Sequence, residues 1–177
     1  MASTGPTGRI SIARLPPSGR ADLAMTRTIS DKPTGALVAA LVEYEEQRRL
    51  AIRREDTPAA NRLYDKTVPI LRELVLREPE GRDALEALLQ HASAFVRLSA
   101  AAKVLGWAPD KAIPVLGRLY TEDLKPAYTP AESGSVRLTA KGLLYRHFGI
   151  RSFNPNHLIE PLKAYGIDWP YRPHFDR

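Results

Sequence analysis

The sequence of 177 residues contains no cysteine, so disulfides and thiolate metal sites are excluded and packing alone must hold the fold. It contains no run of about 18 apolar residues, the length that a membrane-spanning helix requires. Its N-terminal region also lacks the apolar stretch of about 7 to 15 residues that marks a secretory signal. We therefore expect a cytoplasmic protein with no membrane partner.

Signatures of catalysis are missing as well. The four histidines, at positions 91, 147, 157 and 174, lack the i, i+4 spacing around a glutamate that zinc hydrolases use. No segment resembles the glycine-rich loops GxxxxGK or GxGxxG that cradle phosphates. Carboxylates are spread along charged segments, without an apolar setting that would raise a pKa. The sequence predicts no catalytic residues, no metal site and no cofactor, and we expect that the protein is not an enzyme.

Aromatic residues are scarce at 7%, whereas apolar residues reach 44% and are dominated by Ala and Leu, which favours helices. The net charge of +6 is small for this length, and residues 1–24 contribute three basic residues and one acidic residue to it. A nucleic-acid-binding protein usually shows a denser basic face. The charge therefore supports nucleic-acid binding only weakly.

Residues 1–32 mix Ser, Thr, Gly, Pro and Arg without an apolar period, so they bury too little surface to offset the entropy of ordering them. We predict a disordered N-terminal extension over residues 1–32 and one folded domain over residues 33–177. The extension is open to two functional interpretations, an organellar transit segment or a basic arm. The alternative is an upstream stretch that precedes a second possible start at Met25.

A first helix is predicted from Thr34, which can cap it, to about Arg54, with leucines and Tyr44 facing inward. Its charged face is predicted to be solvated, with Glu45 paired with Arg49. The charged residues on it are Glu43, Glu45, Glu46, Arg48, Arg49 and Arg53.

A second helix is predicted from Thr57, again as the cap, to the loop at 78–81. It carries the polar cluster Asn61, Arg62, Tyr64 and Asp65, which either presents a binding site or bonds to a neighbouring helix.

An internal repeat follows. The stretch FVRLSAAAKVL at 95–105 recurs as SVRLTAKGLLY at 135–145, which aligns Val96 with Val136 and Arg97 with Arg137. A short helix precedes each copy, at 82–91 and from Pro109, so each copy returns in a helical hairpin. The small residues after Arg97 predict a close approach between helices.

The second hairpin contains an insertion at 121–134, predicted to be a surface loop, and long loops in compact domains are often functional. Tyr128 at its centre is therefore a candidate contact residue. A last helix is predicted at 156–164 as a cap. The aromatic tail with Trp169 either lies along that helix or protrudes as a partner motif.

The kinked helix AIPVLGRL and the Val-Arg openings of the two return helices resemble HEAT-type repeat proteins over about residues 81–165. More narrowly, NRLYDK at 61–66 and VRLSAA resemble a small bacterial family of uncharacterised HEAT-like helical proteins, extending back to about Leu37. The resemblance implies an all-α fold, a right-handed superhelix of about six to seven helices. In HEAT proteins the arginine joins a ladder with acidic residues, but Phe95 and Ser135 stand where the acidic residue is expected. Arg97 and Arg137 are therefore either paired elsewhere or free to meet a ligand.

Two functions remain. The first is a protein-binding module with an armadillo-like stacked surface, for instance a bacterial immunity or adaptor protein. The alternative is a DNA-binding protein with a basic concave face formed by Arg97, Lys103, Arg137, Lys141 and Arg146. The candidate partner-binding residues are Arg97, Arg137, Lys141, Tyr128, Asn61, Tyr64 and Asp65.

Overall fold

In the computed structural model, which describes residues 29–175, all regular structure is helical, as predicted. The α-helices of this part of the chain are α2 (Thr34–Arg53), α3 (Thr57–Leu76), α4 (Glu80–Ala87), α5 (Ala94–Val104), α6 (Pro109–Thr121), α7 (Pro130–His147) and α8 (Ile159–Lys163). Short 3-10 turns occur at Leu88–Gln90, Pro155–Leu158 and Pro173–Phe175.

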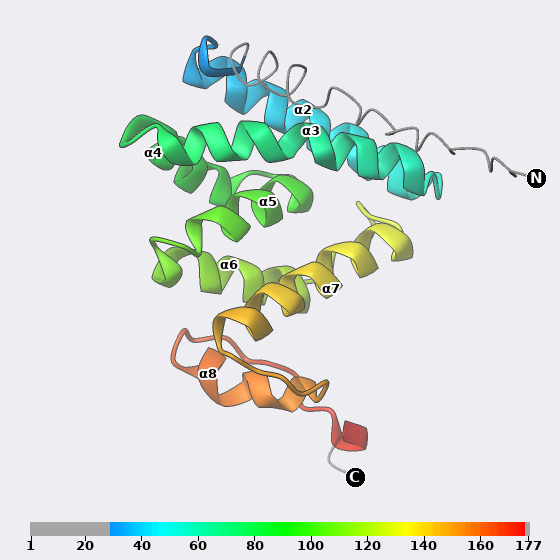
Figure 1. Ribbon diagram of the computed structural model, residues 1–177. Helices are drawn as coiled ribbons and strands as arrows, with labels where there is room; N and C mark the ends of the chain where they lie inside the picture. The colour runs from blue at the N-terminus through cyan, green and yellow to red at the C-terminus, as the bar shows by residue number, and fades with distance from the viewer. Residues whose placement is uncertain (1–28, 176–177) are drawn as a thin grey trace, which may run out of the picture.

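The helices follow one another in layers, from α2 and α3 at one end to α8 and the C-terminal segment at the other (Figure 1). Helix α5 lies in the middle and packs against α2, α4, α6 and α7. Its small residues are buried, including Ala100 and Ala101, which are fully inaccessible. Small side chains let neighbouring helices approach closely, so α5 serves as the centre of a single core.

The two copies of the repeat are both helical, and Val96 and Val136 are both fully buried. Their helices begin differently, however. Helix α5 begins two residues before Val96, whereas α7 begins at Pro130, five residues before the predicted start at Ser135.

The early start of α7 corrects the predicted loop at 121–134, because residues 130–134 are helical and the connection spans only 122–129. The cause is a capping box. The Thr129 hydroxyl accepts from the Glu132 N–H at 3.3 Å, and the Glu132 carboxylate accepts from the Thr129 N–H at 2.6 Å. These reciprocal bonds satisfy donors that the first helical turn leaves unpaired.

Two predicted caps were wrong. Asp56, not Thr57, caps α3 by accepting from the Ala59 N–H at 2.9 Å. Pro33 precedes α2 without a side-chain cap, and the Thr34 hydroxyl accepts from Arg77 instead, at 3.3 Å.

The fold begins a few residues earlier than the predicted boundary at 33. The Arg77 guanidinium donates to the carbonyls of Ile29, Ser30 and Lys32, which ties residues 29–32 to the end of α3. The prediction of disorder for residues 1–28 falls outside the described residues.

The C-terminal segment lies against α6 as well as α8. Leu158 and Leu162 are fully buried, and Trp169 stacks on Tyr120 of α6 with 4.1 Å between ring centroids. Gly117 of α6 permits the close approach of Ile167, because a Cβ at position 117 would lie 2.3 Å from Cδ1 of Ile167. The tail was predicted either to lie along the last helix or to protrude as a partner motif. The aromatic stack instead packs Trp169 on α6 as well.

Candidate functional site

A groove opens between the first two helices and the start of α7. Arg48 and Ile52 of α2 line it, together with Thr57, Ala60 and Asn61 on one side and Ala131 and Ser135 of α7 on the other. It encloses about 350 Å³, near the lower end of small-molecule pockets, and its lining is mostly small and polar. Such a groove suits a side chain or helix of a partner better than an enclosed ligand.

Arg48 is held rigidly at this groove. Its Nη1 lies 3.1 Å from a carboxylate oxygen of Glu45, which is fully buried, and the other oxygen of Glu45 accepts from the Ser99 hydroxyl at 2.5 Å. Burial raises the pKa of Glu45 above its ordinary value, although Arg48 and Ser99 act in the opposite direction. The predicted solvated face of α2 is therefore wrong at Glu45, which joins α2 to α5.

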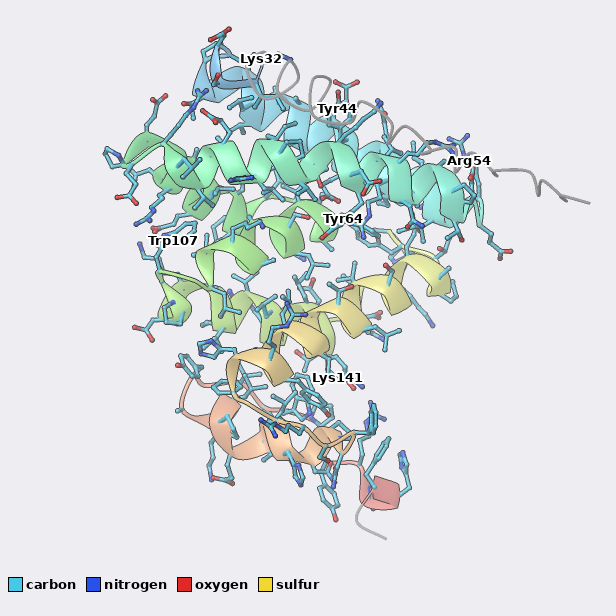
Figure 2. All side chains as sticks on the ribbon, in the orientation of Figure 1. Lys32, Tyr44, Arg54, Tyr64, Trp107 and Lys141 are labelled. Atoms are coloured by element: carbon cyan, nitrogen blue, oxygen red, sulfur yellow. The ribbon has the colours of Figure 1, made fainter. Side chains whose placement is uncertain are left out.

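Aromatic rings flank the same guanidinium. Its carbon lies 5.2 Å from the ring centroid of Tyr64 and 5.8 Å from that of Phe95. Tyr64 belongs to α3 and remains 49% exposed, on the side of that helix that faces α5 and α7 (Figure 2). Cation–π contacts of this geometry fix the arginine further while leaving the tyrosine accessible.

A second buried carboxylate joins α2 to α7 beside the groove. Glu132, fully buried, accepts from Arg49 at 3.0 Å and from Arg53 at 3.2 Å. Burial acts to raise the pKa of Glu132, but the Thr129 cap and Arg53 outweigh it and leave the pKa below its ordinary value. The charged pairs thus set the distance between α2 and the first turn of α7.

Arg49 also bonds to Glu46 at 2.8 Å, and Arg48 bonds to Glu45. The predicted pairing of Glu45 with Arg49 is therefore replaced by two i, i+3 pairs.

Of the predicted contact residues, Asn61 lines the groove. Tyr64 lies beside it, with its ring over Arg48, and Asp65 is exposed on the same helix. Tyr128 is half-buried instead. Its hydroxyl accepts from the Ala94 N–H at 2.8 Å, and its ring stacks on Phe95 at 6.2 Å. It therefore holds the start of α5.

Arg97 and Arg137 meet at a different place, the residue that follows α6. Arg97 forms an ion pair with the carboxylate of Glu122, and Arg137 donates to the Glu122 carbonyl at 2.9 Å. Of the two alternatives predicted for Arg97 and Arg137, the structure shows the first: both arginines have partners within the fold. Lys141 lies over the ring of Tyr145, with 5.6 Å from Nζ to the centroid.

Residues 35–132 match the family described as Domain of unknown function (DUF2019). The chain belongs to this family. The family segment begins two residues before Leu37, where the narrower resemblance was predicted to begin, and it contains Glu45, Arg48, Tyr64 and Glu132. Ser135, Arg137 and Lys141 follow it. No curated protein matches the chain.

A similar solved structure is the crystal structure of the protein RPA1889 from Rhodopseudomonas palustris CGA009. It is 25% identical, with a TM-score of 0.56, and the match covers 72% of this chain and 97% of that one. The likeness agrees with a small uncharacterised bacterial family of helical proteins. The HEAT-like assignment stays a prediction, because neither likeness identifies such repeats.

Sequence reasoning missed the two buried carboxylates, although a signal existed for each. Glu45 continues the series Leu37 and Leu41 at intervals of four, which places it on the apolar face of α2. Glu132 stands three residues after Thr129, the spacing of a capping box.

Residues 29–175 contain neither a metal-binding cluster nor a membrane-spanning helix. No group of three or more His, Asp or Glu side chains is placed to hold a metal ion there. No helix of that range combines the length and the apolar character that crossing a bilayer requires.

Proposed function

We propose that this chain is a non-enzymatic helical module that binds another protein in the groove between α3 and α7. The observation that carries the proposal is Arg48, fixed between the buried Glu45 and the exposed ring of Tyr64. A bacterial immunity or adaptor protein is one concrete form of this function. A toxin encoded beside the gene would favour immunity.

Arginine and tyrosine are among the residues that contribute most to binding at protein interfaces. Binding normally costs about 0.5–1.5 kcal/mol for each flexible side chain that becomes ordered. Arg48 is already ordered by its ion pair and two rings, so most of this cost is absent. The groove therefore presents a preorganised anchor beside an accessible tyrosine and the amide of Asn61.

The same contacts argue against general acid–base chemistry at the groove. The carboxylate of Glu45 has a raised pKa, a property often found in catalytic acids. Both of its oxygens are engaged, however, one by Ser99 and one by Arg48, and the residue is fully buried. Glu45 positions Arg48 and is closed to a substrate.

In the DNA-binding alternative, two of the five cations of the predicted basic face already form bonds within the fold. Arg97 and Arg137 bond to Glu122, so contact with a duplex would require these bonds to break. A protein partner at the groove requires no such change.

Tyr64→Ala is expected to weaken partner binding at least tenfold while leaving the fold intact, because Tyr64 is half exposed. Affinity capture from the source organism with the wild-type chain should recover one partner in stoichiometric amount, and titration of that partner then measures the change. Leu76→Ala is the matched control, since Leu76 lies on the same helix and is 69% exposed. Equal affinity of the partner for the two variants would remove the groove from the proposal.

A further inference from the structure

The C-terminal part of the chain holds a local excess of positive charge. Residues 135–177 contain seven Lys or Arg and three Asp or Glu, a net charge of +4. Residues 29–134 contain 15 basic and 16 acidic residues, a net charge of −1. The basic excess of the folded part therefore lies beyond the segment 35–132 that matches the family, and at the opposite end of the molecule from α2 and α3 (Figure 1).

The same end exposes aromatic side chains. Phe153 is 91% exposed, Tyr171 is 59% exposed and Phe175 is 42% exposed. A single exposed aromatic residue is ordinary on a protein surface, but several that gather at one end indicate a binding surface.

Hydrogen bonds bring these residues together from separate parts of the chain. The Asn154 side chain donates to the Phe175 carbonyl at 3.1 Å, and Asn156 exchanges two bonds with the backbone of Arg172, at 2.8 and 3.0 Å. The Tyr145 hydroxyl donates to the Phe153 carbonyl at 3.5 Å. The turn after α7 and the C-terminal segment thus form one surface.

Cations border the rings on this surface. Lys141 covers Tyr145, whose hydroxyl donates to the Phe153 carbonyl. Arg151 precedes Phe153 by two residues and is exposed, as is Arg172. No salt bridge within residues 29–175 engages these three cations. We name this set the aromatic–basic surface: Lys141, Tyr145, Arg151, Phe153, Arg172 and Phe175.

We propose that the aromatic–basic surface binds single-stranded nucleic acid. Unpaired lysines and arginines attract the phosphate backbone, and exposed rings provide platforms on which unpaired bases stack. An acidic peptide would use the cations but would leave the rings without a matching group. In duplex DNA the bases are already stacked on one another, so the rings favour single strands. This site is separate from the groove and goes beyond the proposed function.

The test is fluorescence anisotropy of a labelled 20-nucleotide oligothymidine with the full chain at about 50 mM salt. Binding is expected, and one phosphate contact for each of the three cations predicts an affinity that falls about 20-fold between 50 and 200 mM salt. Phe153→Ala is expected to weaken binding about tenfold, and Phe175→Ala should act in the same direction. Because Phe153 is almost fully exposed, its removal should leave the helical circular dichroism unchanged.

Two controls separate this surface from other sources of charge. Leu76→Ala, at the far end of the molecule, should bind like the wild type. The variant with Arg9, Arg14, Arg20 and Arg27 changed to Gln removes the basic residues of 1–28 and should retain binding. No anisotropy change at about 50 mM salt would overturn the proposal, as would unaltered affinity in Phe153→Ala, loss of binding in the Arg9–Arg27 variant, or equal competition by duplex DNA or polyglutamate.

Discussion

Replacing Glu132 with alanine is expected to lower the free energy of unfolding by about 2 kcal/mol, between the values for exposed and fully buried ion pairs, because Glu132 is buried while Arg53 is 42% exposed. The carboxylate is fully buried and accepts from Arg49 and Arg53 of α2. It also accepts from the Thr129 N–H as part of the capping box of α7. The substitution therefore removes the charge that joins α2 to α7 and the cap of α7 together.

Urea unfolding followed by circular dichroism measures this loss of stability. Glu132→Gln separates the contribution of the ion pairs with α2 from that of the capping box. A glutamine at this position can still accept from the Thr129 N–H, so it should retain the cap and lose only the charge. Because the pKa of Glu132 is lowered in the folded state, its contribution is complete above its ordinary value of 4.5 and is lost as pH falls through the folded-state pKa. If Glu132→Ala lowers the free energy of unfolding by less than about 1 kcal/mol, the ion pairs of Glu132 are no stronger than exposed ones. That result would contradict their role in holding α2 against α7.

Arg48→Ala is expected to lower the free energy of unfolding by about 3 kcal/mol at pH 7, because it leaves the buried carboxylate of Glu45 without its cation. Burial raises the pKa of Glu45 above 4.5 in the wild type, and loss of Arg48 raises it further. The folded variant then takes up a proton at a higher pH than the unfolded chain. The destabilisation is therefore complete above the folded-state pKa and declines as pH falls toward 4.5.

Unfolding curves of the wild type and Arg48→Ala between pH 4 and 8 test this sign. Glu45→Gln provides the matched background, since glutamine can still accept from Ser99 and carries no charge. In that background Arg48→Ala should cost about 1 kcal/mol or less, with little dependence on pH. A pH-independent loss of equal size in both backgrounds would mean that Arg48 acts only through packing.

The helical class and the approximate positions of most helices could be predicted from the sequence, because apolar spacing and proline and glycine positions are local signals. The buried Val96 and Val136 agree with the repeat that was read from the sequence. The start of α7 was predicted five residues too late, because the spacing of Val136 and Leu144 carries no information about the preceding turn. The capping box of Thr129 and Glu132 begins the helix there.

The site was harder to predict, because its parts come from distant segments. Asn61 and Tyr64 were predicted as contact residues from their clustering within α3. The groove is also lined by Arg48 and Ser135, which are 87 residues apart in sequence. Tyr128 was identified as a contact residue from its place in an insertion. Its hydrogen bond to Ala94 and its stack on Phe95 arise only from the packing of that insertion on α5.

Photo-crosslinking shows whether a partner protein occupies the groove between α3 and α7. A benzoylphenylalanine placed at Asn61 in the groove should form a one-to-one crosslink with the captured partner, whereas the same group at Leu76 should form none. Crosslinks from position 76 of equal yield, or none from position 61 while the partner remains bound, would contradict the account.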